Sequence, residues 1–305
     1  MTAANSLNKI IYADHAATTP IDEDALNLMI ELQRKFFANP SSAYKLSRSL
    51  KKILLESREK IAACINAEPN EIIFTSGGTE SNNWAIKSSV LEILSEHPNI
   101  ITSAIEHKAI LNSCAAMKNL GCTVTKLSVD KFGNVNPDDL RKKILPKTKI
   151  ISVMFANNEV GTIQPIKSLA EISHAAGKIF HTDAVQAVGH IPIDVKILVV
   201  DMLSASAHKF NGPKGIGFLY IRDGLKILPY IDGGGQEFKI ALCSMAEVIM
   251  LGRSLKISST EDFIAQLLLS VPPDVKIISL GLALIQAAIF SRDSSKIFFK
   301  GRESL

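Results

Sequence analysis

The chain has 305 residues, of which 47% are hydrophobic and 21% are charged, and its formal net charge is +4. These values are typical of a globular protein with a large buried core. The small positive charge comes without a dense block of lysines and arginines, so nothing in the composition indicates nucleic-acid binding.

The N-terminal part is predicted to contain one short strand and two helices. We expect the strand at residues 10–12, followed by a polar turn and by a helix over 23–37 that Asp22 can cap. A second helix, capped by Ser41 or Ser42, is expected to reach about residue 65.

From residue 71 strand-like and helix-like segments alternate. Strands are expected at 72–74, 100–102, 123–127, 150–155, 178–182, 198–203 and 217–221, and helices at 79–94, 108–118, 137–144 and 166–176. This alternation predicts a three-layer α/β fold with a mostly parallel sheet and helices on both faces. We expect an N-terminal segment (1–20), a large domain (21–237) and an atypical tail (238–305) without clear alternation.

The four cysteines form neither a CxxC pair nor a metal-ligand spacing. We therefore expect free thiols, no bound metal and a reducing compartment such as the cytoplasm. Residues 1–9 are polar and lack the apolar core of a signal peptide. The longest apolar stretch, 277–290, is too short to span a bilayer, so no membrane partner is expected.

A lysine stands at the centre of the motif pattern. Lys209 follows an apolar run and precedes a Gly-Pro-Lys-Gly turn, so its amine is presented at a defined place. Lysine forms Schiff bases with carbonyl substrates or with pyridoxal phosphate. The ordinary alternative is a solvated lysine beside a turn.

Other polar residues follow predicted strands, where open α/β sheets bind ligands. Gly77 and Gly78 open a helix after the first of these strands, as a phosphate site or as a plain connection. His107 could lie against an aromatic cofactor or cap a helix. Residues 157–159 could orient a polar group or form a turn. Asp183 ends an apolar strand and needs a cation, such as a protonated pyridine nitrogen.

These parts together form a consistent site for pyridoxal phosphate. The sequence motifs that contain them resemble those of the cysteine desulfurases. That family lies in the class-V aminotransferase group of fold-type I pyridoxal-phosphate enzymes. The similar motifs are YADHAATTP (12–20), NPSS (39–42), TSGGTESNN (75–83), EHK (106–108), NNEVG (157–161), HTDAVQ (181–186), SAHK (206–209) and GGGQE (233–237). They cover residues 10 to 237 in family order.

The resemblance implies a role for each matched residue. Lys209 would carry the cofactor and move the proton at the substrate α-carbon, and Asp183 would pair with the pyridine nitrogen. His107 would stack on the ring and assist proton transfer. Gln186 would bond the ring hydroxyl, with Asn158 near that hydroxyl and the substrate carboxylate. The phosphate would be held by Gly78, Thr79, Ser206 and His208.

The resemblance also implies the reaction and the partners. L-Cysteine would be converted to L-alanine, with the sulfur left as a persulfide on an enzyme cysteine. The protein would be a homodimer that passes sulfur to an acceptor such as an iron–sulfur scaffold protein.

The tail departs from the family pattern. In the family an Arg-Ser-Gly-Thr motif follows the position of Glu237, and a cysteine in a Ser/Gly-rich loop lies far beyond the lysine. In this chain the last cysteine is Cys243. A shifted reading frame, a misjoined exon or a truncated copy would explain the break. Three hypotheses stay open at this point: a cysteine desulfurase, a catalytically silent fold that binds pyridoxal phosphate, and a non-functional fragment.

Overall fold

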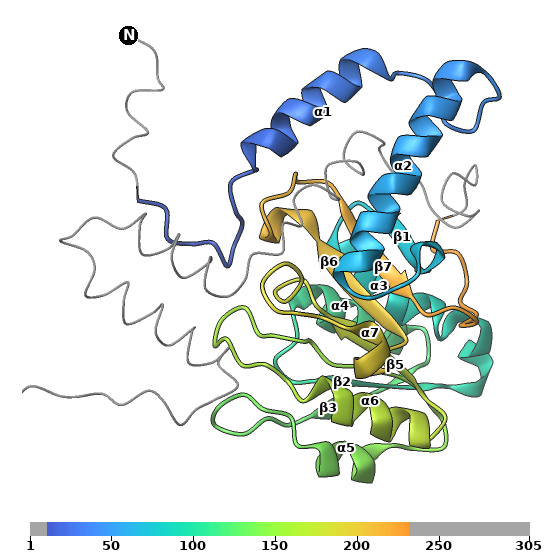
Figure 1. The fold of residues 1–305 in the computed structure, drawn as a ribbon. Coiled ribbons are helices and arrows are strands. Elements are labelled where there is room, and N and C mark those ends of the chain that lie inside the picture. Colours follow the sequence, from blue (N-terminus) through green and yellow to red (C-terminus); the bar gives the residue numbers. More distant parts are fainter. Residues whose placement is uncertain (1–10, 232–305) are drawn as a thin grey trace, which may run out of the picture.

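A computed structural model describes residues 11–231 of the chain, and its main feature is a seven-stranded sheet (Figure 1). The strand order is β1-β7-β6-β5-β4-β2-β3, and β7 runs antiparallel to both of its neighbours while the other pairs are parallel. The strands are β1 (Ile72–Thr75), β2 (Asn99–Ser103), β3 (Thr123–Leu127), β4 (Thr148–Ser152), β5 (Ile179–Asp183), β6 (Met202–Ser206) and β7 (Gly217–Ile221).

Helices cover both faces of this sheet. The α-helices are α1 (Glu23–Lys35), α2 (Lys45–Cys64), α3 (Gly78–Ser88), α4 (Lys108–Asn119), α5 (Pro137–Lys143), α6 (Ile166–Ala175) and α7 (Val195–Leu198). One core cluster joins α2, α5, α6 and α7 to the sheet, and the other joins α3 and α4 to its opposite face. The predicted three-layer α/β fold is confirmed for the described residues.

Apolar runs in the sequence explain why these strands form. All residues of β1, β2 and β6 are buried, as expected for strands that are covered on both faces. Within the described part of the chain, no helix combines the length and the apolar character that a membrane span requires.

Several expected boundaries are wrong. The strand expected at 150–155 ends at Ser152, and the strand expected at 198–203 starts at Met202. The second shift arises because Asp194 caps the helical turn α7 and Val199 ends it with a φ of 50°. The helix expected over 79–94 is interrupted, since α3 ends at Ser88 and a separate 3-10 helix, η4 (Leu91–Glu96), follows.

The N-terminal expectations are corrected in the same way. The described part of the segment at 10–12 is not a strand. The Asp22 cap is confirmed, because its side chain accepts hydrogen bonds from two backbone amides of α1. Neither Ser41 nor Ser42 caps α2, because both lie in a turn at Asn39 and the helix starts later, at Lys45, with Tyr44 at the N-cap position. The tail at 238–305 and the boundary at 237 lie outside the described residues.

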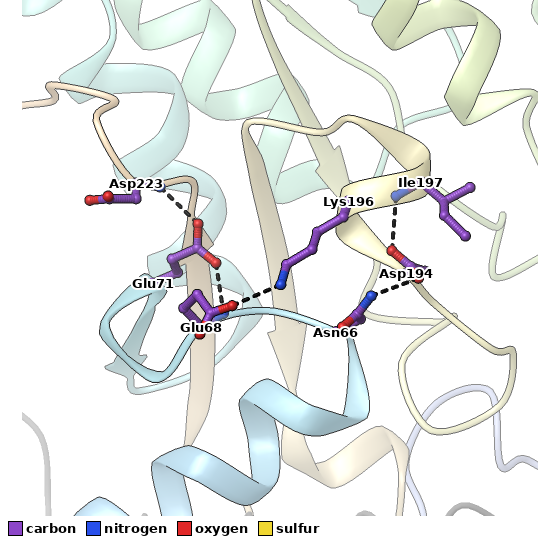
Figure 2. Close-up of polar contacts among 7 residues, drawn as sticks. All are labelled: Asn66, Glu68, Glu71, Asp194, Lys196, Ile197 and Asp223. Atoms are coloured by element: carbon purple, nitrogen blue, oxygen red, sulfur yellow. Dashed lines mark hydrogen bonds and ion pairs between the residues drawn. The ribbon is translucent and has the colours of Figure 1, made fainter.

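Polar contacts fasten the edge of the sheet at which β1 begins and β7 ends (Figure 2). The buried Glu71 carboxylate accepts from the amides of Glu68 and Asp223 at 2.8 Å each. Lys196 pairs with Glu68 at 2.7 Å. These contacts hold the start of β1, the end of β7 and α7 together. The motif residues lie at the opposite edge of the sheet.

Candidate cofactor site

The glycine turn after β1 packs against the ends of two other strands. A Cβ on Gly78 would lie 2.6 Å from Val185 Cγ2, and one on Gly77 would lie 3.4 Å from Ser206 Oγ. Gly77 has a φ of 146°, which favours glycine. Gly77 caps α3 without a side-chain acceptor, so the first-turn amides and the exposed Thr79 can meet an anion.

A buried carboxylate, Asp183, ends β5. Asp183 Oδ1 accepts from the Val185 amide at 3.0 Å, and Oδ2 accepts from Asn82 Nδ2 at 2.6 Å. Burial raises the pKa of Asp183, while these hydrogen bonds and the charges of His107 and Lys209 lower it. Asp183, His107 and Lys209 therefore interact electrostatically, although they come from three different loops and strands.

The lysine amine is already held by the N-terminal segment. Lys209 follows β6 in the short helix η5 (Ala207–Lys209), and its Nζ donates to Ala16 O at 2.6 Å and to Ala17 O at 2.8 Å. Gln186 Nε2 donates to the same Ala16 oxygen at 2.9 Å. Burial lowers the pKa of Lys209, so a larger fraction of its amine is neutral and nucleophilic at a given pH.

The residue before the lysine is bound by the same segment. His208 Nδ1 lies 3.1 Å from Thr18 Oγ1, and its carbonyl accepts from the Thr19 amide at 2.8 Å. Burial, followed by the charges of Lys209 and Lys214, lowers the pKa of His208. A neutral imidazole here can still donate a hydrogen bond to an anion.

In the loops after β2 and β4, His107 and Asn157 make local hydrogen bonds. His107 is exposed, and its Nδ1 caps α4 by accepting from the Ala109 amide at 3.1 Å. Asn157 makes its turn by accepting from two following amides, and its Nδ2 donates to Ile105 O at 3.0 Å. Asn158 is half-buried beside it. The capping and turn alternatives therefore hold for His107 and Asn157, and neither excludes contact with a ligand.

The arrangement fits pyridoxal phosphate. A buried carboxylate, an amine of lowered pKa and a helix start with free amides share one edge of the sheet. Gly78 packs against Ser206, and hydrogen bonds join Gln186 and His208 to the N-terminal segment. The charges of His107 and Lys209 act on the Asp183 carboxyl. The ligand contacts of every named residue, including Thr79 and Asn158, stay predictions.

Sequence reasoning missed three groups of this site. Asn82 bonds Asp183, Ala16 and Ala17 hold the Lys209 amine, and Thr18 and Thr19 bind His208. All of these residues lie inside the sequence motifs that match the family. Proximity to Gly78 within TSGGTESNN was the available signal for Asn82.

Known proteins match the chain over most of its length. The family model described as Aminotransferase class-V matches residues 11–254, beyond the last motif word at 237. Cysteine desulfurase IscS of Methanosarcina thermophila is 48% identical over 256 residues, and that of Dictyoglomus turgidum is 47% identical over 257 residues. These alignments cover 83% and 84% of this chain but 63% and 65% of the relatives, so the chain spans less than two thirds of their length.

Solved structures share the fold. The structure of SspA in complex with cysteine has a TM-score of 0.82 at 36% identity, covering 89% of this chain and 78% of that one. A NifS-like protein has a TM-score of 0.82 at 36% identity, with coverage of 90% and 76%.

Proposed function

This chain belongs to the class-V aminotransferase family, whose cysteine desulfurases depend on pyridoxal phosphate, and we propose that it binds this cofactor and acts on L-cysteine. The observation that carries the proposal is the buried Asp183 carboxylate at the end of β5, which pairs with β6, the strand that leads to Lys209. The proposed reaction converts L-cysteine to L-alanine and transfers the sulfur to an acceptor.

Each residue of the proposed site would contact a particular part of the cofactor. Lys209 would bind it covalently, Asp183 would face the ring nitrogen, and His107 would cover the ring. Gln186 would bond the ring hydroxyl, with Asn158 near that hydroxyl and the substrate carboxylate. The phosphate would be held by Gly78, Thr79, Ser206 and His208.

When bound, pyridoxal phosphate supplies a ring that withdraws electrons from the substrate α-carbon. The chain's own residues would do the proton chemistry. Lys209 Nζ, with its lowered pKa, would take the proton from the α-carbon and return it. Asp183, ionised and buried, would keep a positive charge on the ring nitrogen. His107 would donate or accept the second proton.

The sulfur balance needs an acceptor thiol. The C–S bond of cysteine breaks, an S–S bond to the acceptor forms, and the β-carbon gains a proton, so cysteine and a thiol give alanine and a persulfide. Burial raises the pKa of Cys64, of Cys122 and, to about 12, of Cys114, which makes these three poor nucleophiles. Cys243 lies outside the described residues. We therefore expect transfer to an external thiol and weak activity without one.

The partners and the setting are also proposals. By family, the chain would form a homodimer and deliver sulfur to an acceptor such as an iron–sulfur scaffold protein. The described cysteines carry free thiols, which supports a reducing compartment such as the cytoplasm.

Visible absorbance tests the cofactor proposal. Purified chain incubated with pyridoxal phosphate and dialysed should be coloured, Lys209→Ala should be colourless, and Lys214→Ala in the same turn should match the wild type. Alanine and sulfide are then measured with L-cysteine and an excess of dithiothreitol. Colour without either product would favour the catalytically silent binding fold, and a colourless wild type would contradict both readings.

A further inference from the structure

Glu106 is a buried carboxyl that the proposed reaction does not use. It lies between β2 and α4, immediately before His107, and is 6% exposed. Its Oε1 accepts from Ser103 Oγ at 2.5 Å and from the Met154 amide at 2.8 Å. The side chain therefore joins the loop that carries His107 to the segment that follows β4.

A second contact joins the same two loops. Asn157 Nδ2 donates to Ile105 O at 3.0 Å, one residue before Glu106. Asn157 also holds its own turn, in which Asn158 lies. The places of His107 and Asn158 relative to one another thus depend on the contacts of Glu106 and Asn157.

The environment of Glu106 favours its neutral form. Within residues 11–231, its Oε2 atom is buried without a hydrogen-bond partner, which is costly for a carboxylate. Burial, with a smaller contribution from the negative charge of Asp183, raises the pKa of Glu106 to about 8, against hydrogen bonds from Ser103 and Met154 that lower it.

Two other titratable groups interact with Glu106. The negative charge of Asp183, at the end of β5, raises the pKa of Glu106, and burial raises the pKa of Asp183 as well. Burial also raises the pKa of the Cys114 thiol on α4, so this thiol adds no negative charge at neutral pH. Simultaneous negative charge on Glu106 and Asp183 is therefore disfavoured in this buried corner.

We propose that Glu106 is a positioning residue: its buried carboxyl ties the His107 loop to the segment that follows β4 without adding a second negative charge near Asp183. This inference rests on the proposed function, in which Asp183 faces the ring nitrogen. Ionisation of Glu106 would place a second negative charge near Asp183, while the hydrogen bonds from Ser103 and Met154 would persist. The bound cofactor should report that change.

The first test is the visible absorbance of the pyridoxal-phosphate complex between pH 6 and 10. Wild type should show a spectral component with a midpoint near pH 8 that Glu106→Gln lacks, since glutamine keeps the shape of the neutral acid. Glu71→Gln is the matched control, because Glu71 is also a glutamate 6% exposed but lies at the opposite edge of the sheet (Figure 2). An unchanged component in Glu106→Gln would overturn the proposal.

Ser103→Ala is the second variant and protects the test against a misfolded Glu106→Gln. The Ser103 hydroxyl stabilises the Glu106 carboxylate, so its loss should move the midpoint to higher pH. A purely structural role for this contact would leave the midpoint in place, and that result would contradict the proposal.

Cofactor-free protein separates this inference from the proposed function. Between pH 6 and 8 the folded chain keeps the Glu106 proton that the unfolded chain has released, so stability should fall as the pH rises. The fall in melting temperature should be smaller in Glu106→Gln than in wild type. A colourless wild type with this difference would contradict only the proposed function, and equal slopes would contradict only the role of Glu106.

Discussion

Gly217, the first residue of β7, should tolerate no side chain. A Cβ there would collide with the carbonyl oxygen of Ala205 on β6 and would lie 2.7 Å from Gly77 Cα and 3.0 Å from Gly77 C. All three obstacles are backbone atoms, so no flexible side chain can move aside. Because Gly77 forms the turn before α3, Gly217→Ala should disturb both the sheet and the proposed phosphate turn.

The expected cost follows from overpacking in a dense core. Such insertions cost about 1–3 kcal/mol, and backbone obstruction on two sides places this one at about 3 kcal/mol. At roughly 2–4 °C per kcal/mol for a chain of this size, the melting temperature should fall by about 6–12 °C. Loss of one hydrogen bond to a charged phosphate, about 1.5–3 kcal/mol, would weaken cofactor binding roughly 10- to 100-fold.

Thermal unfolding followed by far-UV circular dichroism and a pyridoxal-phosphate titration measure these two effects. Gly177→Ala is the control, because Gly177 has a φ of 67° and a methyl group added there would meet nothing within 4 Å, so it costs only the left-handed strain of about 1 kcal/mol. If Gly217→Ala melted at the same temperature as this control and bound the cofactor like wild type, the close packing of Gly217 on Gly77 would be refuted.

Three further outcomes are expected. Lys209→Met should speed amide hydrogen exchange in the N-terminal segment of cofactor-free protein, since its amine supplies two hydrogen bonds to that segment; unchanged exchange would contradict this. Asn82→Ala should weaken cofactor binding roughly 10-fold or more by removing a donor from the buried Asp183, and affinity equal to wild type would show that donor to be dispensable. His181, whose pKa burial lowers to about 3, should lower the stability of wild type relative to His181→Gln by about 1.4 kcal/mol per pH unit as the pH falls from about 6.5 toward 3, because the unfolded chain binds the proton first. A difference in urea-derived stability between wild type and His181→Gln that stays constant over that range would count against a neutral buried imidazole.

Glu106 and His181 should change the pH dependence of stability in opposite directions. The retained proton of Glu106 makes stability fall as the pH rises from about 4.5 to 8, while His181 makes it rise from about 3 to 6.5. Their effects largely offset each other between pH 4.5 and 6.5. The single variants should therefore reveal slopes that the wild type hides.

The amino-acid sequence by itself determined the fold class and the motif positions. Strands that are buried on both faces must be apolar runs, so their alternation with amphipathic helices predicted a parallel three-layer arrangement. Local signals also sufficed for Asp22, whose cap depends only on the next three residues. Gly78, His107 and Asp183 were found because each stands at the end of a strand or the start of a helix, whereas the roles of Thr79, Ser206 and His208 came from the family resemblance.

Only the tertiary structure decided which of these residues meet. Lys209 binds a carbonyl 193 residues away, and Asn82 binds a carboxylate 101 residues away. Such pairs leave no periodic trace in the chain, because they arise from strand order and register rather than from local propensity. The raised pKa of Glu106 belongs to the same class, since the burial and the Asp183 charge that raise it come from elements that are distant in the sequence.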